Sequence, residues 1–427
     1  MDGGRELVGT RPGDAADLLQ GTSQLVAVDT LSAPSVPVRK IDLEVPASRT
    51  SRWIAELKFP VVTYLATRVL LLAIAIAGDG IFSGVVRRIS ISGEFANWDG
   101  WWYVRVATLG YPTQVSHSQT TLGFLPVYSM TMWLVAHIFS SSYVIAGMII
   151  SGVGGLVATV LIQRLTTEWW GPQVARKAVL LFCLFPGTII FSMDYSEGLL
   201  IPLLAGCMLA LHHRRWLLAG VLAGIATGIG PDALVVIPMC ATASLVQLWR
   251  YGWQDGEARR SLVAPLLAPF GAAAFSLFLW FWTGSPFASL IAQKAGWHES
   301  TSPFALPNQL VLLLKDIGPR FRWWNINLNI IVGLLGAAFL VVGLRWLWRD
   351  RGTLPLEVQV FTACMTFLMV TSWHVPPNPR MLITGFPVVL IFAKWLHDRA
   401  WTRFIWCTGA MLVVLSTMTY VGSVLRP

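Results

Sequence analysis

Long apolar runs separated by short polar segments constrain this 427-residue chain more than any other feature of its sequence. A helix needs about 20 apolar residues to cross a bilayer. The run 123–139 fits either a further span or a re-entrant helix pair. The sequence therefore predicts an all-α, polytopic membrane helix bundle of about 11 or 12 transmembrane helices. The other candidate runs are 59–77, 142–165, 175–192, 197–212, 216–230, 233–249, 262–283, 326–346, 357–373, 381–397 and 402–424.

The charged residues indicate a topology for this bundle. Only 12% of the residues are charged, about half the share in a soluble domain, so the net charge of +9 does not indicate a nucleic-acid partner. If 123–139 does not cross, most basic clusters fall on one side, as expected for cytoplasmic loops. Residues 1–55 are polar and lack the apolar core of a signal peptide. We expect a disordered cytoplasmic tail over 1–55, a membrane domain over 56–427, and membrane lipid as a partner.

An aspartate flanked by tryptophans lies in the first outer loop, 78–122. The tetrapeptide N-W-D-G occupies 97–100, and aromatic residues continue to Tyr111. The spacing of Tyr103, Ala107 and Tyr111 predicts an amphipathic helix over 98–109 that lies on the membrane. Asp99 would then stand in the first turn, where the helix dipole favours the ionised carboxylate that a general base needs. A helix cap among interfacial aromatics is the structural alternative.

The run W-D-G-W-W-Y-V-R-V-A-T-L-G-Y at 98–111, followed by G-F-L-P at 123–126, resembles a family signature. The signature is W-D-x-x-H-F-x-x-I-A-x-x-G-Y … F-F-P of the PIG-V mannosyltransferases, which are GT-C membrane enzymes that use polyprenyl-phosphate-mannose. Weaker matches follow at 195–197 (Y-S-E), 227–232 and 379–380 (P-R), so the resemblance covers about 60–400. This chain departs from the family in having Trp102 in place of a histidine, Gly230 in place of an arginine and Asp232 in place of an asparagine.

The resemblance implies an inverting glycosyltransferase of GT-C type in the cell membrane, or in the ER membrane of a eukaryote. Mannose would move from polyprenyl-phosphate-mannose to a hydroxyl of a glycolipid, glycan or protein on the extracytoplasmic face, without a metal or other cofactor. Asp99 would be the catalytic base, and cations on the same face would stabilise the departing phosphate. The expected substrate-binding residues are Trp98, Trp102, Tyr195, Glu197, Asp232, Lys294, His374 and Arg380.

Three alternatives remain open at the level of sequence. The same fold could use another polyprenyl-linked sugar, or the chain could be a non-catalytic membrane subunit. A transporter of a lipid-linked substrate would show a polar path through the bilayer, often within inverted repeats. An enzyme should instead gather Asp99, Glu197 and Arg380 in one cavity at the outer face. Arg68, within the first apolar run, is either a functional residue or a structural partner of a carbonyl or carboxylate.

Overall fold

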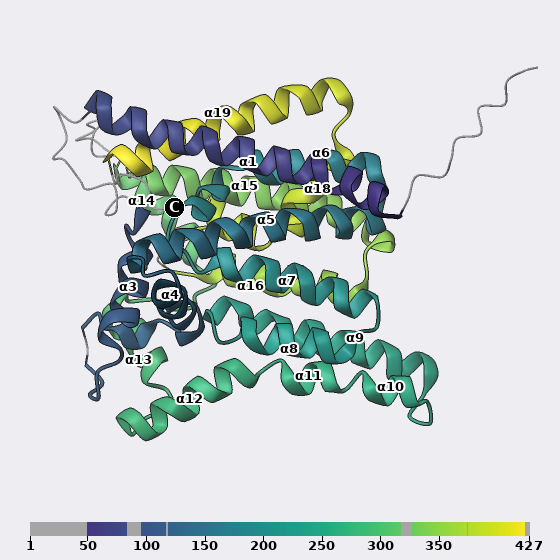
Figure 1. The fold of residues 1–427 in the computed structure, drawn as a ribbon, viewed down its shortest axis with the longest axis horizontal. Helices are drawn as coiled ribbons and strands as arrows, with labels where there is room; N and C mark the ends of the chain where they lie inside the picture. Colours follow the sequence, from purple (N-terminus) through teal and green to yellow (C-terminus); the bar gives the residue numbers. More distant parts are fainter. Residues whose placement is uncertain (1–48, 83–94, 117, 317–326, 374, 423–427) are drawn as a thin grey trace, which may run out of the picture. The chain divides into compact units, whose positions relative to one another are not determined.

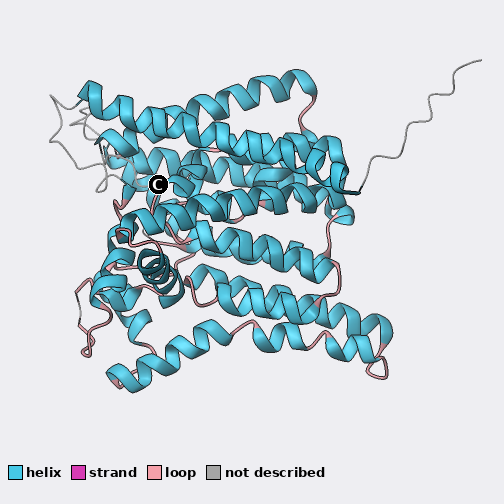
Figure 2. Ribbon diagram, in the orientation of Figure 1, coloured by secondary structure: helices cyan, strands magenta, loops and turns pink. Residues whose placement is uncertain are grey.

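The computed structural model describes residues 49–82, 95–116, 118–316, 327–373 and 375–422. Within these ranges the chain is helical and has no β-strand, apart from an isolated bridge between Thr301 and Ser372 (Figure 2). The predicted all-α membrane bundle is therefore confirmed. The expected tail as far as residue 48, and His374, lie outside the described residues.

Most of the described helices follow one another with short connections, and a longer loop over 110–120 separates α3 from the next element (Figure 1). The α-helices are α1 (Arg49–Phe82), α3 (Asp99–Leu109), α4 (Pro126–Ile138), α5 (Tyr143–Trp170), α6 (Pro172–Leu184), α7 (Glu197–His212), α8 (Trp216–Ala226), α9 (Val236–Tyr251), α10 (Gly256–Arg260), α11 (Val263–Leu267), α12 (Phe270–Thr283), α13 (Ala288–Gly296), α14 (Ala305–Asp316), α15 (Leu328–Arg349), α16 (Leu356–Thr371), α17 (Pro379–Thr384), α18 (Pro387–Trp395) and α19 (Asp398–Gly422). The 3₁₀ segments are η1 (Thr121–Gly123), η2 (Pro186–Ser192), η3 (Pro231–Val235) and η5 (Arg351–Thr353).

The described residues contain six helices that are long and apolar enough to cross a membrane. Three shorter apolar helices, α7, α8 and α16, accompany them. A seventh candidate consists of α6 and η2, which meet at an angle of 69°. The break falls at Pro186, which lacks an amide hydrogen and cannot continue a helix. The six are Glu56–Ala77, Tyr143–Trp170, Pro231–Tyr251, Gly256–Thr283, Leu328–Arg349 and Asp398–Tyr420.

The ambiguous run 123–139 forms one short helix, α4. Its 13 residues span about 20 Å at 1.5 Å per residue, which is less than the roughly 30 Å hydrocarbon core of a bilayer. Figure 1 shows α4 nearly end-on, whereas α1, α5 and α7 run across the view. Helix α4 packs against both α3 and α5, so it connects the helix that carries Asp99 to the bundle.

Small residues bring α5 and α7 into close contact at the bundle centre. A side-chain carbon added at Gly154 would overlap the main-chain carbonyl of Gly198, and one added at Gly198 would overlap Ser151. Such close approach of two backbones is typical of small residues at helix interfaces in membranes. The contact fixes the first turn of α7, which begins with Glu197, against α5.

Candidate active site

Arg380 joins two carboxylates that are far away in the sequence. Its Nη1 donates a hydrogen bond of 2.6 Å to Asp99 Oδ2, and its Nε lies 3.0 Å from Glu197 Oε1. The exposed fractions of the side chains are 32% for Asp99, 22% for Arg380 and 8% for Glu197. The structure thus gathers the three residues from α3, α7 and α17, and Asp99 has the most exposed side chain of the three.

Asp99 is held by an unusual local backbone. It is the first residue of α3, one position after the expected start of the amphipathic helix. Trp98 before it has φ 59° and ψ −117°, a region that side-chain-bearing residues rarely adopt and that is found at functional sites. At Gly100, a side-chain carbon would lie 3.0 Å from the Asp194 carbonyl oxygen, so glycine lets α3 begin close against the segment before α7.

Tyr195 and Tyr103 form the inner wall of this cluster. The Arg380 guanidinium lies over the ring of Tyr195, 5.2 Å from its centroid, in a cation–π arrangement. The Tyr103 hydroxyl shares a hydrogen bond of 2.7 Å with Ser196 Oγ, next to Glu197. The sequence predicts Tyr103 only as a residue of the amphipathic helix, although its position four residues after Asp99 puts both on one helix face.

Three acidic side chains lie around the single guanidinium of Arg380. Asp232, at the start of η3, is within electrostatic reach of both Arg380 and Glu197. Burial opposes the charge on Arg380, but Glu197 and Asp99 hold the pKa of its guanidinium well above the usual value. Arg380 therefore stays charged between its two carboxylate partners.

Asp194 lies behind the cluster and is chemically different from it. Its side chain is fully buried, and neither carboxylate oxygen has a hydrogen-bond partner. Burial raises the pKa of this carboxyl to about 9, so Asp194 is neutral at physiological pH. It supplies no charge to the site.

The other expected site residues lie farther out or belong to other contacts. The Trp102 ring stacks on Phe124 at 5.8 Å and meets the edge of Trp297 at 5.1 Å. Trp98 is partly buried beside Asp99. Lys294 is exposed near the end of α13, and no described contact joins it to the Asp99–Glu197–Arg380 cluster. Within the described residues, no three His, Cys, Asp or Glu side chains gather where they could hold a metal ion.

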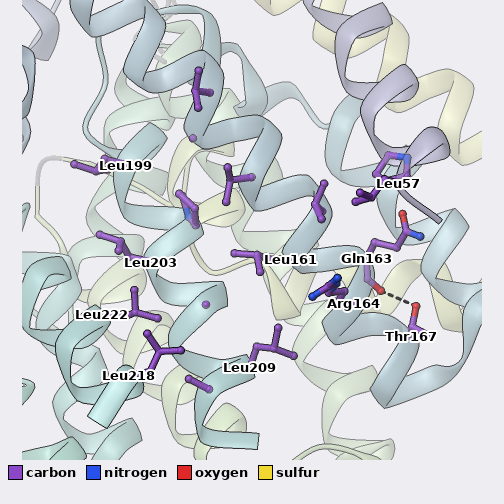
Figure 3. Close-up of a pocket in the computed structure, with 18 of the residues that line it drawn as sticks. Leu57, Leu161, Gln163, Arg164, Thr167, Leu199, Leu203, Leu209, Leu218 and Leu222 are labelled. Atoms are coloured by element: carbon purple, nitrogen blue, oxygen red, sulfur yellow. Dashed lines mark hydrogen bonds between the residues drawn. The ribbon is translucent and has the colours of Figure 1, made fainter. Parts of the chain in front are cut away.

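Two apolar grooves open along the helices near the site. One, of about 940 Å³, lies between α1, α5, α7 and α8 and is lined by leucines such as Leu161, Leu203 and Leu222 (Figure 3). The other, of about 1180 Å³, is lined by Val106 and Ala107 of α3 together with residues of α4, α8 and α12. Neither groove is lined by Asp99, Glu197 or Arg380, so the charged cluster and the apolar grooves are separate features.

The fold and this cluster define a multi-pass helical membrane protein with an ion-paired polar site. No protein-family model matches the chain. Over 217 residues, 47% of the chain and 42% of the relative, it is 24% identical to GPI alpha-1,6-mannosyltransferase 2 of mouse. The chain thus matches less than half the length of that curated relative.

Two solved structures overlap with larger shares of the chain. ArnT from Cupriavidus metallidurans bound to undecaprenyl phosphate has a TM-score of 0.41 and 15% identity, over 78% of this chain and 61% of that chain. Archaeal oligosaccharyltransferase AglB from Archaeoglobus fulgidus, in complex with an inhibitory peptide and a dolichol-phosphate, has a TM-score of 0.43 and 12% identity, over 84% of this chain and 56% of that chain. Likenesses this distant carry no argument about function.

Proposed function

We propose that this chain is a membrane-embedded GT-C glycosyltransferase of PIG-V type. It transfers mannose from polyprenyl-phosphate-mannose to a hydroxyl of a glycolipid, glycan or protein. The observation that carries the proposal is the ion-paired cluster in which Asp99, partly open to the outside, is held by Arg380 beside Glu197. The W-D-G-W-W-Y motif around Asp99 and the partial sequence similarity to a mouse mannosyltransferase support it.

In this proposal Asp99 is the general base. It accepts the proton of the acceptor hydroxyl while that oxygen bonds to the anomeric carbon of the donor sugar. The bond between the anomeric carbon and the phosphate oxygen breaks, and the lipid phosphate leaves with the electron pair. Attack opposite the leaving group inverts the anomeric carbon, so a β-linked donor gives an α-linked product.

Arg380 is the proposed partner of the departing phosphate. A guanidinium can bind two phosphate oxygens at once, and Arg380 is the cation that already touches the base. In this proposal Glu197 orients the guanidinium through its ion pair with Nε and also binds sugar hydroxyls. Asp232 completes the acidic rim in reach of the same arginine.

We place the site on the extracytoplasmic face. Helix α7 runs from Glu197 at the site to His212, and Arg214 and Arg215 follow at its other end. Basic residues of short loops are enriched on the cytoplasmic side of membrane proteins. The end of α7 away from the cluster is therefore the cytoplasmic one in this proposal.

The test is sugar transfer in membranes that contain the expressed chain, with radiolabelled polyprenyl-phosphate-mannose as donor. Asp99→Asn keeps the shape of the side chain and removes the base, so we expect a loss of about 100-fold or more in label transferred to a larger product. Asp255→Asn is the matched control, because Asp255 caps α10 by accepting from the Ala258 amide and asparagine caps equally well. It should transfer label like the wild type.

The other outcomes of this assay are also informative. Equal transfer by Asp99→Asn and the wild type would remove Asp99 from the mechanism. No transfer by folded wild-type protein would reject mannose as the sugar. The same assay with other polyprenyl-linked sugars would then separate a different donor from a non-catalytic subunit.

A further inference from the structure

We infer that Arg68 is a positioning residue that holds Arg380 in place through the 3₁₀ segment η2. Arg68 lies within the first membrane span and does not touch the charged cluster. Its hydrogen bonds go instead to η2, and η2 packs against α17, the helix that carries Arg380. The inference rests on the proposed function only in its activity test. Its hydrogen-exchange test does not depend on that function.

The first step is the attachment of Arg68 to η2. Its Nη1 donates to the Thr188 carbonyl oxygen at 2.7 Å and to Ser192 Oγ at 3.1 Å, and its Nη2 donates to Thr188 Oγ1 at 3.3 Å. The guanidinium also lies over the ring of Tyr64, 4.9 Å from its centroid. Arg68 thus binds η2 at Thr188 and at its last residue, Ser192, and ties it to α1.

The second step is the contact between η2 and α17. A side-chain carbon added at Gly187 would overlap the Pro379 carbonyl oxygen and would lie 3.1 Å from the Arg380 amide nitrogen. The two backbones therefore touch directly, next to the residue that Arg68 binds. A shift of η2 moves the start of α17, and with it the guanidinium that pairs with Asp99 and Glu197.

The third step is the contact of the segment before α17 with α15, which forms a second wall beside this segment. Side-chain carbons added at Gly333 or Gly336 of α15 would overlap Pro376 and the Pro377 carbonyl, respectively. The segment before Arg380 is thus enclosed by glycine contacts on α15 and η2. Because the proline-rich segment is itself stiff, the position of Arg380 depends on both walls.

The chemistry of the Arg68 contacts explains why an arginine is needed there. A cation within a membrane span is costly, so it is retained where it binds groups that compensate for the lost hydration. The planar guanidinium binds one carbonyl and two hydroxyl oxygens of η2 with fixed geometry, whereas a lysine ammonium is a single point charge. We therefore expect lysine to rescue only part of the Arg68 function.

The structural test is amide hydrogen exchange on the full chain in lipid nanodiscs. The reporters in α17 are the amides of Leu382 and Gly385, which donate to the carbonyls of Asn378 and Met381. In Arg68→Met we expect these amides to exchange at least tenfold faster, with an intermediate rate in Arg68→Lys. Arg176→Met is the matched control, because Arg176 lies over Phe59 of α1 without touching η2; its α17 amides should exchange at the wild-type rate.

The activity test asks whether Arg68 acts through Arg380. Arg68→Met should lower sugar transfer by at least tenfold in the wild-type background and by less than twofold in Arg380→Lys. The inference would be overturned if Arg68→Met lowered sugar transfer by the same factor in both backgrounds. It would also be overturned if the α17 amides of folded Arg68→Met exchanged at the wild-type rate. If the wild-type chain transfers no sugar, the proposed function fails, and the exchange experiment still decides the role of Arg68. If Arg68→Met does not fold, the Arg68→Lys variant decides by the same two readouts.

Discussion

Arg380 is the residue on which the site depends most. Its guanidinium forms ion pairs with Glu197, whose side chain is almost completely buried, and with Asp99. Removing one partner of a buried pair leaves a charge without compensation, which costs far more than losing a pair at the surface.

We therefore expect Arg380→Met to lower the free energy of unfolding by about 3 kcal/mol, since it leaves Glu197 buried and unpaired. Arg260→Met is the control, because its partner Glu257 and Arg260 itself are both well exposed, and it should cost less than about 1 kcal/mol. Unfolding in a detergent titration, followed by tryptophan fluorescence, measures both. Equal losses for the two variants would show that the Arg380 cluster is hydrated like a surface pair.

Asp194 makes the stability of the fold depend on pH. In the unfolded chain an aspartate loses its proton above pH about 4, whereas burial keeps the folded carboxyl protonated up to about pH 9. The folded state then binds more protons than the unfolded state, so the stability that Asp194 contributes falls as pH rises from about 4 to 9.

Asp194→Asn should remove this part of the pH dependence. We expect the difference in unfolding temperature between Asp194→Asn and the wild type to shift in favour of the variant as pH is raised from 5 to 8. Thermal unfolding in buffered detergent at several pH values checks this. Parallel curves for the two proteins would mean that Asp194 is hydrated and ionised in the folded chain.

At the residue scale, the sequence predicted Asp99, Glu197 and Arg380 together with Tyr195, but it missed Tyr103 and the neutral state of Asp194. Asp99, Glu197 and Arg380 stand beside helix starts and prolines, which are visible signals. Tyr103 was not predicted as a site residue because a tyrosine on an amphipathic helix is also an ordinary membrane-surface residue. The neutral state of Asp194 depends on burial by several distant helices, which no local pattern records.

At the scale of the element, backbone contacts decide where the charged residues lie. Helices α5 and α7 approach so closely at Gly154 and Gly198 that neither residue has room for a side chain. Glu197 directly precedes Gly198 in the chain, so a shift of α7 at this contact also moves the Glu197 carboxylate in the site.

Gly154→Val tests this dependence. The added side chain would overlap the Gly198 carbonyl and push α7 away from α5, so we expect a loss of unfolding free energy of at least about 2 kcal/mol and a loss of sugar transfer. Gly206→Ala on α7 is the control: its new carbon would lie 3.3 Å from the flexible end of Leu222, and alanine favours the helix. The free energy of unfolding and the sugar transfer are measured for both variants. If Gly154→Val were tolerated as well as Gly206→Ala, the expectation would be wrong.

Apolar runs located the elements but not their breaks. The expected run 175–192 is one apolar segment, yet it bends by 69° at Pro186. The run 381–397 divides into α17 and α18 around Pro387. Proline marks both breaks in the sequence, but a proline inside a membrane helix is often tolerated, so neighbouring helices decide whether the chain bends.

At the scale of the whole chain, the distribution of charge predicts an orientation. The carboxylate cluster lies at the start of α7, and a basic pair follows its end. The proposed topology places the first end outside the cell and the second in the cytoplasm.

Cysteine labelling in intact bacterial cells measures this orientation. In a variant whose five cysteines are replaced, Trp101→Cys lies on an exposed position of α3 and should react with a membrane-impermeant maleimide. Arg214→Cys, exposed beyond the end of α7, should react only after the cells are permeabilised. The reverse pattern would place the cluster on the cytoplasmic side and exclude an extracytoplasmic transfer reaction.

The glycine contacts that enclose the segment before Arg380 also bear on how active relatives are recognised. Gly187, Gly333 and Gly336 carry no chemistry, yet any larger residue there would move the arginine without altering a single charge. A homologous chain could therefore keep Asp99, Glu197 and Arg380 and still be inactive. Among diverged sequences, the small residues around the proline-rich segment should be inspected together with the charged ones before activity is assigned.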